Sequence, residues 1–254
     1  HFYIVDAKTL YYENSAVVGA NLSGLTILNE QYGLVTGDGI RRIDLKSLNN
    51  VRIKNERLLC FYNSIIYNGK VLSNDTYKDE SKVKYYDVNE LIAAKEGEAP
   101  AVTELDIIQK QKINFVLAKD GNVYTLESAD NGCNIVKIKN DFTLEKVFAN
   151  FQPAKGPYHS SPTIGMVASE TENIIYLVST DGAIYKYILG DSDSLKAPFI
   201  AAESGVSITA PLQMNQQSGE LYVTYTEELK DESKIVVYSK DGKVLHTVAV
   251  SYTH

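Results

Sequence analysis

The sequence contains no tryptophan, and among its 254 residues it has only two cysteines and four histidines. Two thiols, Cys60 and Cys133, are too few for a disulfide scaffold, so we expect both to be unpaired. A zinc site needs three or four convergent ligands, and His159 is the only histidine in a long loop well inside the chain. The sequence therefore predicts neither a metal nor a cofactor.

Long hydrophobic runs are missing as well. No apolar run approaches the ~18 residues that a membrane-spanning helix needs, so no transmembrane segment is predicted. Basic side chains are outnumbered, with 25 Lys and Arg against 32 Asp and Glu, and the net charge is -7. Nucleic-acid binding needs clustered basic residues, so a nucleic-acid partner is not expected. A hydrophobic content of 44% is enough for a folded core.

Helical periodicity is nearly absent. One short stretch, Asn89–Lys95, favours a helix, and Gly97 and Pro100 end it. Elsewhere short runs of Val, Ile, Tyr and Thr alternate with turn residues, a pattern typical of an all-β chain.

A repeat organises these strands. The string Val5–Leu10 recurs as Ile43–Leu48 and, more loosely, as Tyr86–Leu91. A strand, a polar turn and a leucine recur along the whole chain, with the leucines at Leu10, Leu48, Leu91, Leu144, Leu195 and Leu245. A repeat of ~40–50 residues with four short strands is typical of a propeller blade.

The repeat predicts an all-β fold, a β-propeller of four-stranded antiparallel blades. We trace about six blades, with five or seven as alternatives, in a single domain over residues 1–254. Residues 1–20 supply only strands three and four of a leading blade, and no signal peptide is visible. We therefore expect that upstream sequence is missing, or that the terminal strands share a closing blade.

The connections of the predicted blades differ in length. The turns between strands one and two are tight, and those between strands three and four are mostly tight. Several connections on the opposite face are long, at 74–81, 128–132, 151–162 and 226–233. Long loops on a rigid scaffold often carry binding groups, so this face is the predicted site. Its candidate ligand-binding residues are Tyr77, Lys78, Asp130, Asn131, Tyr158, His159, Glu227 and Lys230.

The sequence gives little indication of a catalytic site. Ser160 and Ser161 adjoin His159, but no nucleophile-elbow motif is present, so no catalytic residue is predicted. Arg41 with Arg42 is either an anion clamp or a pair at the start of a strand, of which one faces solvent and pairs with a carboxylate. Tyr77, Tyr158 and Tyr225 are either aromatics that stack on a ligand or residues that pack on a sheet.

The strings Ser218–Thr224 and Lys234–Leu245 resemble a blade of the YncE-like (YVTN-type) β-propellers, and Val5–Leu10 is similar to a phrase of the same group. That family includes cell-surface and periplasmic lipoproteins of Gram-negative gut anaerobes, and its members usually have seven blades. The resemblance implies a non-enzymatic protein outside the cytoplasm, lipid-anchored upstream. It would bind a small molecule, a cobalamin-type ligand or a glycan beside a TonB-dependent outer-membrane transporter. The alternatives are a structural interaction propeller and a lyase or hydrolase acting at the channel mouth.

Overall fold

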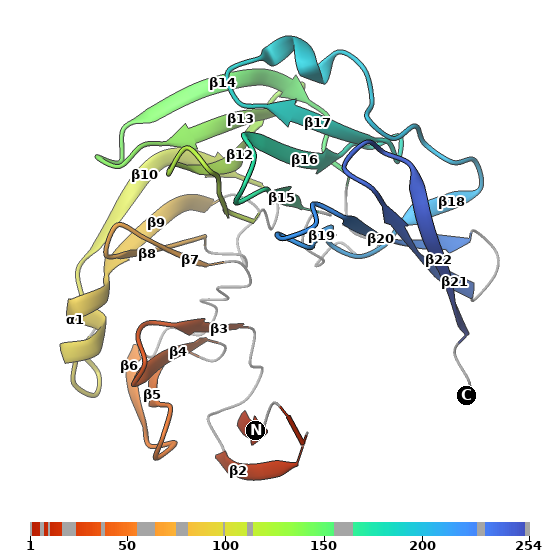
Figure 1. Cartoon of the computed structure of the whole chain (residues 1–254). Helices are drawn as coiled ribbons and strands as arrows, with labels where there is room; N and C mark the ends of the chain where they lie inside the picture. The colour runs from red at the N-terminus through yellow and green to blue at the C-terminus, as the bar shows by residue number, and fades with distance from the viewer. Residues whose placement is uncertain are drawn as a thin grey trace. The chain divides into compact units, whose positions relative to one another are not determined.

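The computed structural model describes residues 2–5, 8–9, 11–16, 24–36, 39–54, 64–74, 81–98, 100–110, 114–154, 165–227 and 232–251. The chain divides into two compact units, His1–Lys110 and Gln111–His254. Both units are built from antiparallel sheets whose strands follow one another along the chain (Figure 1).

Within the described residues, the first unit contains three sheets. They are β1 (Phe2–Val5) with β2 (Tyr12–Ala16); β3 (Gly24–Ile27), β4 (Tyr32–Thr36), β5 (Ile40–Asp44) and β6 (Asn50–Lys54); and β7 (Ile65–Tyr67), β8 (Lys70–Asn74), β9 (Ser81–Asp87) and β10 (Val102–Gln109). The predicted helix is present as α1 (Val88–Ala93), between β9 and β10. It begins where the Asp87 carboxylate accepts hydrogen bonds from the backbone N–H groups of Asn89 and Glu90.

The described part of the second unit also contains three sheets. They are β11 (Val116–Leu117), β12 (Val123–Ala129), β13 (Gly132–Ile138) and β14 (Leu144–Phe151); β15 (Met166–Ala168), β16 (Ile174–Val178) and β17 (Ile184–Ile188); and β18 (Val206–Ile208), β19 (Gln213–Met214), β20 (Leu221–Glu227), β21 (Glu232–Tyr238) and β22 (Val244–Ser251). Strands β18 and β19 both pair with β20. A short 3-10 helix, η1 (Ser192–Leu195), follows β17.

These sheets confirm the prediction of an all-β chain of antiparallel blades. Three hydrophobic clusters of the described residues combine side chains from consecutive sheets. In the second unit, Ile135 of β13 and Leu177 of β16 belong to one buried cluster, and Tyr176 of β16 and Val223 of β20 belong to the next. In the first unit, Leu34 of β4 and Val71 of β8 share a cluster. Alternating side chains of one sheet therefore pack against the following sheet, as blades do.

Two side-chain amides join neighbouring first strands in the second unit. Asn114 Nδ2 donates to the Met166 carbonyl at 2.7 Å, and Asn114 Oδ1 accepts from the Met166 N–H at 2.9 Å. Gln216 Nε2 donates to the Ala168 carbonyl at 3.0 Å, and its Oε1 accepts from the Glu170 N–H at 2.8 Å. Each amide acts as an extra peptide group, because it uses one donor and one acceptor that lie in a plane.

The predicted contrast between an economical and an elaborated face is wrong in part. Residues 128–132, predicted as a long connection, form a two-residue turn, because pairing of β12 with β13 continues to Ala129 and Gly132. Helix α1 lies between β9 and β10, the third and fourth strands of their sheet, and η1 follows β17, the third strand of its sheet. Loop elaboration therefore occurs at both ends of the sheets. The predicted loops at 75–80, 155–164 and 228–231 lie outside the described residues.

Candidate functional site

The eight predicted binding residues divide into two groups. Asp130, Asn131 and Glu227 lie in the described part of the chain. The other five lie outside the described residues, and they are Tyr77, Lys78, Tyr158, His159 and Lys230. The candidate site is therefore built from the second unit, around the turn that contains Asp130 and Asn131.

Asp130 and Asn131 form the whole turn between β12 and β13, which we call the hairpin tip. Both residues are exposed. Among the described residues, neither the Asp130 carboxylate nor the Asn131 carboxamide has a hydrogen-bond or ion-pair partner. The tip thus presents one carboxylate and one carboxamide to solvent.

The backbone of the hairpin tip is held in place by the residue that follows β14. Gln152 Nε2 donates a hydrogen bond to the Asn131 carbonyl at 2.5 Å. Gly132 completes the turn with φ 122°, a backbone conformation that residues with a Cβ rarely adopt. A Cβ at this position would lie 2.5 Å from both Gln152 Nε2 and the Phe151 carbonyl oxygen. Glycine is therefore required here both by conformation and by space.

The charges next to the hairpin tip are paired. Glu127 Oε2 accepts a hydrogen bond from Asn134 Nδ2 at 2.8 Å and lies 3.6 Å from Lys146 Nζ. Cys133, between Asn134 and the tip, is free and buried, which confirms the prediction for this thiol. Burial, together with the nearby Glu127 charge, raises the pKa of the Cys133 thiol to about 11. The thiol is therefore protonated and a poor nucleophile at neutral pH.

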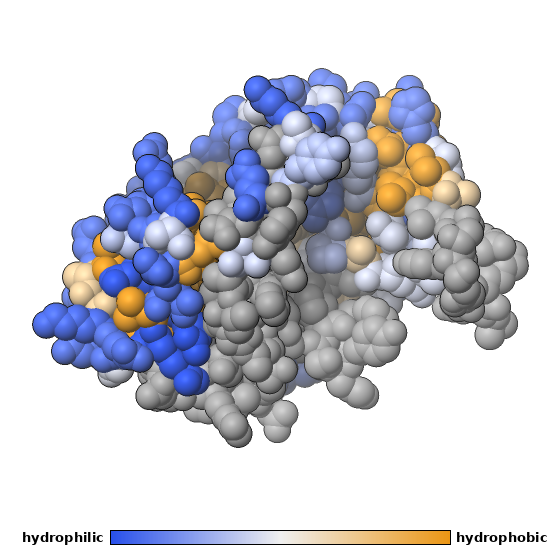
Figure 2. All heavy atoms as spheres, turned by 90° about the horizontal axis from the view of Figure 1, so that it is seen from below, coloured by the Kyte–Doolittle hydropathy of each residue, from blue (hydrophilic) through white to orange (hydrophobic). Residues whose placement is uncertain are grey.

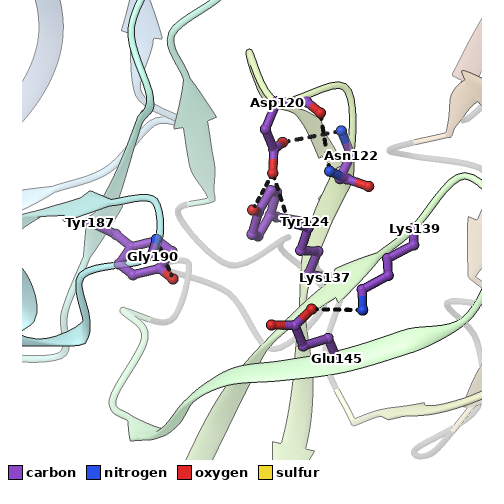
Figure 3. Close-up of polar contacts among 8 residues, drawn as sticks. All are labelled: Asp120, Asn122, Tyr124, Lys137, Lys139, Glu145, Tyr187 and Gly190. Atoms are coloured by element: carbon purple, nitrogen blue, oxygen red, sulfur yellow. Dashed lines mark hydrogen bonds and ion pairs between the residues drawn. The ribbon is translucent and has the colours of Figure 1, made fainter.

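A denser polar network occupies the opposite end of the same sheet, in the turn between β11 and β12 (Figure 3). The Asp120 carboxylate accepts a hydrogen bond from the Tyr124 hydroxyl at 2.8 Å and lies 2.9 Å from Lys137 Nζ. The Asn122 N–H donates to the same carboxylate at 3.1 Å. Lys137 Nζ also lies 5.8 Å from the centre of the Tyr124 ring. These residues close the turn around one carboxylate.

The network sets the protonation of its members. Burial raises the pKa of Asp120, but hydrogen bonds from Lys137, Tyr124 and Asn122 outweigh it, so the pKa lies below its usual value. Burial, and then the hydrogen bond to Asp120, raise the pKa of Tyr124. Asp120 is therefore ionised and Tyr124 protonated at neutral pH. Since the carboxylate is satisfied within the protein, this network stabilises the turn and leaves no free group for a ligand.

Glu227 ends strand β20 in a different sheet, where it pairs with Val206. Beside it, the Thr226 hydroxyl lies 2.9 Å from that of Thr209 and 3.0 Å from that of Ser233. Lys234 follows Ser233 in β21, and its Nζ donates hydrogen bonds to both carboxylate oxygens of Glu203, at 2.8 and 3.1 Å. Hydroxyls and a paired charge thus accompany Glu227 at the end of β20.

Arg42 and Tyr225, for which the sequence allowed either a ligand-binding or a structural role, both have structural roles. Arg42 donates to the carbonyls of Ile92 and Ala94, the latter at 3.1 Å, so its guanidinium binds the end of α1. Tyr225 is buried, and its hydroxyl lies 3.0 Å from that of Tyr238. Sheet packing is the correct interpretation of Tyr225. In the described residues, no group of three His, Cys, Asp or Glu side chains gathers as a metal site would require.

Sequence reasoning missed Gln152 and the Asp120 network. The ion pair between Asp120 and Lys137 joins a turn to strand β13, and a local pattern does not reveal it. Gln152 lies within a predicted long connection and carries no motif of its own. No helix in the described ranges is long and apolar enough to cross a membrane.

A family model, described as a domain of unknown function (DUF5074), matches residues 1–253. The chain belongs to the DUF5074 family. None of the curated proteins matches this DUF5074 chain in sequence.

Among solved structures, the DUF5074 chain is similar to a quinonprotein alcohol dehydrogenase-like protein from Bacteroides thetaiotaomicron, with 99% identity and a TM-score of 0.94. The match covers 98% of this chain and 60% of that protein, so the chain spans less than two thirds of its length.

Two more distant structures share the fold. A virginiamycin B lyase from Staphylococcus aureus matches with 13% identity and a TM-score of 0.55, over 99% of this chain and 78% of that one. A protein of unknown function from Desulfotomaculum acetoxidans matches with 11% identity and a TM-score of 0.61, over 97% and 75% of the two chains. At such identities the likeness shows the fold alone. With the sheets described above, it establishes that the DUF5074 chain is a β-propeller.

Proposed function

We propose that this β-propeller is a non-enzymatic binding module whose ligand contacts the hairpin tip Asp130–Asn131. One observation carries the proposal: two polar side chains are exposed and, among the described residues, free of protein partners, on a backbone that Gln152 and Gly132 hold in place. A binding group on a fixed backbone loses little conformational entropy when a ligand arrives. The network around Asp120, in contrast, satisfies its own groups.

The chemistry of the tip favours a polar ligand with many hydroxyl groups, such as a glycan or a polar small molecule. A carboxylate accepts hydrogen bonds, and a carboxamide both donates and accepts them. The charges of Glu127 and Lys146 behind the tip are paired with each other, so they add no net field that would select a charged ligand.

We also propose where the protein acts: at the cell surface or in the periplasm, as a lipoprotein that assists nutrient uptake beside an outer-membrane transporter. Its support is the resemblance of Ser218–Thr224 and Lys234–Leu245 to YncE-like propellers. A structural interaction propeller without a small ligand is the alternative. A lyase or hydrolase with His159 at the channel mouth is less favoured, since no catalytic group adjoins the hairpin tip among the described residues.

The test is a panel of glycans and cobalamin-type ligands screened by thermal shift, followed by calorimetry. A ligand at 100 times its Kd should stabilise the chain by about 2.7 kcal/mol. The double variant Asp130→Ala with Asn131→Ala should lose at least ~10-fold in affinity, or ~1.4 kcal/mol, while remaining folded.

The matched control removes two exposed side chains from turns at the other end of the same sheet, Lys119→Ala with Asn140→Ala. The control should bind as the unchanged chain does. Equal affinity of both double variants would contradict a role for the hairpin tip. A screen without any shift would favour the structural module, and product formation that His159→Ala abolishes would favour the enzyme.

A further inference from the structure

Strand β22 is the outermost strand of its sheet, and in the described part of the chain it pairs with β21 alone. Every residue from Val244 to Ala249 is exposed. Three of these side chains are large and apolar, with exposed fractions of 59% for Val244, 43% for Leu245 and 53% for Val248. Figure 2 shows apolar surface gathered on the side of the second unit where this sheet lies. An open strand edge offers N–H and C=O groups for pairing with another strand.

In the described residues, the last strands of the three four-stranded sheets carry charges, and β22, the last strand of its own sheet, carries none. Strand β6 contains Arg52 and Lys54, β10 contains Glu104 and Asp106, and β14 contains Glu145 and Lys146. The sequence of β22 is VLHTVAVS, in which His246 is the only titratable side chain. Charged side chains protect an edge, because bringing another strand beside them removes water from the charge. Strand β22 lacks this protection.

The pairing of β22 with its neighbour β21 is also more regular than the pairing of β10 or of β14 with its neighbour. The register of β10 breaks between Glu104 and Ile108, and that of β14 breaks on both sides of the pair at Ile135. In β22 the irregularity lies at its start, and pairing runs unbroken from His246 to Ser251. Bulges twist an edge away from a partner, so a regular edge accepts a partner more readily.

We propose that β22 is an interaction edge, which pairs antiparallel with β22 of a second copy of the chain to form a two-fold dimer. Antiparallel pairing of identical strands satisfies two-fold symmetry, since each strand meets the same surface on its partner. With Val248 on the symmetry axis, Val248 of one copy faces Val248 of the other, and Thr247 faces Ala249. No like charges meet in this arrangement.

The same symmetry disfavours self-pairing of β10. A two-fold pair of β10 strands centred on Leu105 would place Glu104 of one copy opposite Asp106 of the other. Like charges directly opposite each other on neighbouring strands destabilise the pair. No such repulsion arises between two β22 strands, which contain no Asp, Glu, Lys or Arg.

The size and charge of the chain set the expected behaviour. One strand pair makes an interface at or below the small end of specific interfaces, ~1,200 Å², so the dimer should be weak. Each copy carries a net charge of -7, so two copies repel at a distance. Because salt screens this repulsion and leaves apolar contacts intact, dimerisation should strengthen as the salt concentration rises.

The experiment is sedimentation velocity of the chain from ~1 to ~100 µM, at low salt and at ~0.5 M salt. We expect a monomer at the lowest concentration, a dimer at the highest, and a larger dimer fraction at high salt. The variants Val248→Lys and Ala249→Lys, on opposite faces of β22, should each be monomeric throughout. Circular dichroism and thermal unfolding show that they are folded.

The control is Val102→Lys, which adds the same charge to an exposed valine of β10, with an exposed fraction of 42%. This variant should dimerise as the unchanged chain does. A monomer at every concentration and salt level would overturn the proposal, and so would a dimer that persists in both β22 variants.

Discussion

The sheet β11–β14 has an aspartate at each end, and the two carboxylates differ in whether the protein bonds them. At one end, the Asp120 carboxylate is bonded by Tyr124 and Lys137, so the protein satisfies it. At the other end, Asp130 is exposed, and in the described residues its carboxylate has no partner, while Gln152 holds the adjacent backbone. The first end uses its polar side chains to stabilise a turn. The second end uses backbone contacts for that purpose and leaves its side chains available.

This difference indicates where stability and function reside in the sheet. A carboxylate that is already bonded can bind a ligand only by giving up its protein partners, which costs free energy. A free carboxylate on a fixed turn has no such cost. Substitutions should therefore affect stability at the Asp120 end and binding at the hairpin tip, with the tip glycine as the exception.

The largest expected effect is that of Gly132→Ala. The added Cβ would meet the Phe151 carbonyl and Gln152 in a backbone conformation that disfavours it, so we expect a loss of about 3 kcal/mol in the free energy of unfolding. Gly121→Ala, in the turn at the opposite end, meets nothing within 4 Å and strains only the backbone at φ 74°. We expect it to cost about 1 kcal/mol. Urea denaturation measures both, and equal losses would contradict the close contact at the tip.

The second largest expected effect on the free energy of unfolding is that of Asp120→Asn. Loss of the charge weakens the bonds from Lys137 and Tyr124, so we expect a loss of about 2 kcal/mol at pH 7. Asp130→Asn should change stability by less than about 0.5 kcal/mol. Urea denaturation of the two variants compares the bonded and the free carboxylate directly. Similar losses would remove the contrast between the two ends.

The effect of Asp120 should depend on pH with a defined sign. The folded state lowers the pKa of Asp120 below 3.8, so its contribution to stability is complete above that value and is lost as the pH falls through the folded pKa. The difference between the unchanged chain and Asp120→Asn should therefore be constant near neutral pH and should shrink in acid. Denaturation at several pH values tests this, and a difference that grew on acidification would contradict the bonded carboxylate.

The smallest expected effect on stability is that of Gln152→Ala. Its side chain is exposed, so the loss of the hydrogen bond to Asn131 should cost about 0.5–1 kcal/mol. Its effect on the hairpin tip should be clearer, with faster amide hydrogen exchange around Asn131 and weaker ligand binding. Unchanged exchange at the tip would mean that Gly132 and strand pairing hold the turn without Gln152.

Much of the fold could be read from local patterns. Short runs of Val, Ile and Tyr separated by turn residues, together with the recurring leucines, predicted antiparallel blades, and the helix near Leu91 lies where its pattern placed it. These features depend on residues a few positions apart, whose conformational preferences act locally.

Other features depend on register and on contacts between distant residues. The Ser128–Gly132 segment was expected as a loop, but pairing of Glu127 with Asn134 and of Ala129 with Gly132 extends both strands through it. The bond of Asp120 to Lys137, and that of Gln152 to Asn131, join residues 17 and 21 positions apart. Composition and periodicity do not encode such contacts, because they form only when the strands are aligned. The repeat in the chain thus specifies its blades, and the alignment of those blades specifies which polar groups are bonded and which are free to bind.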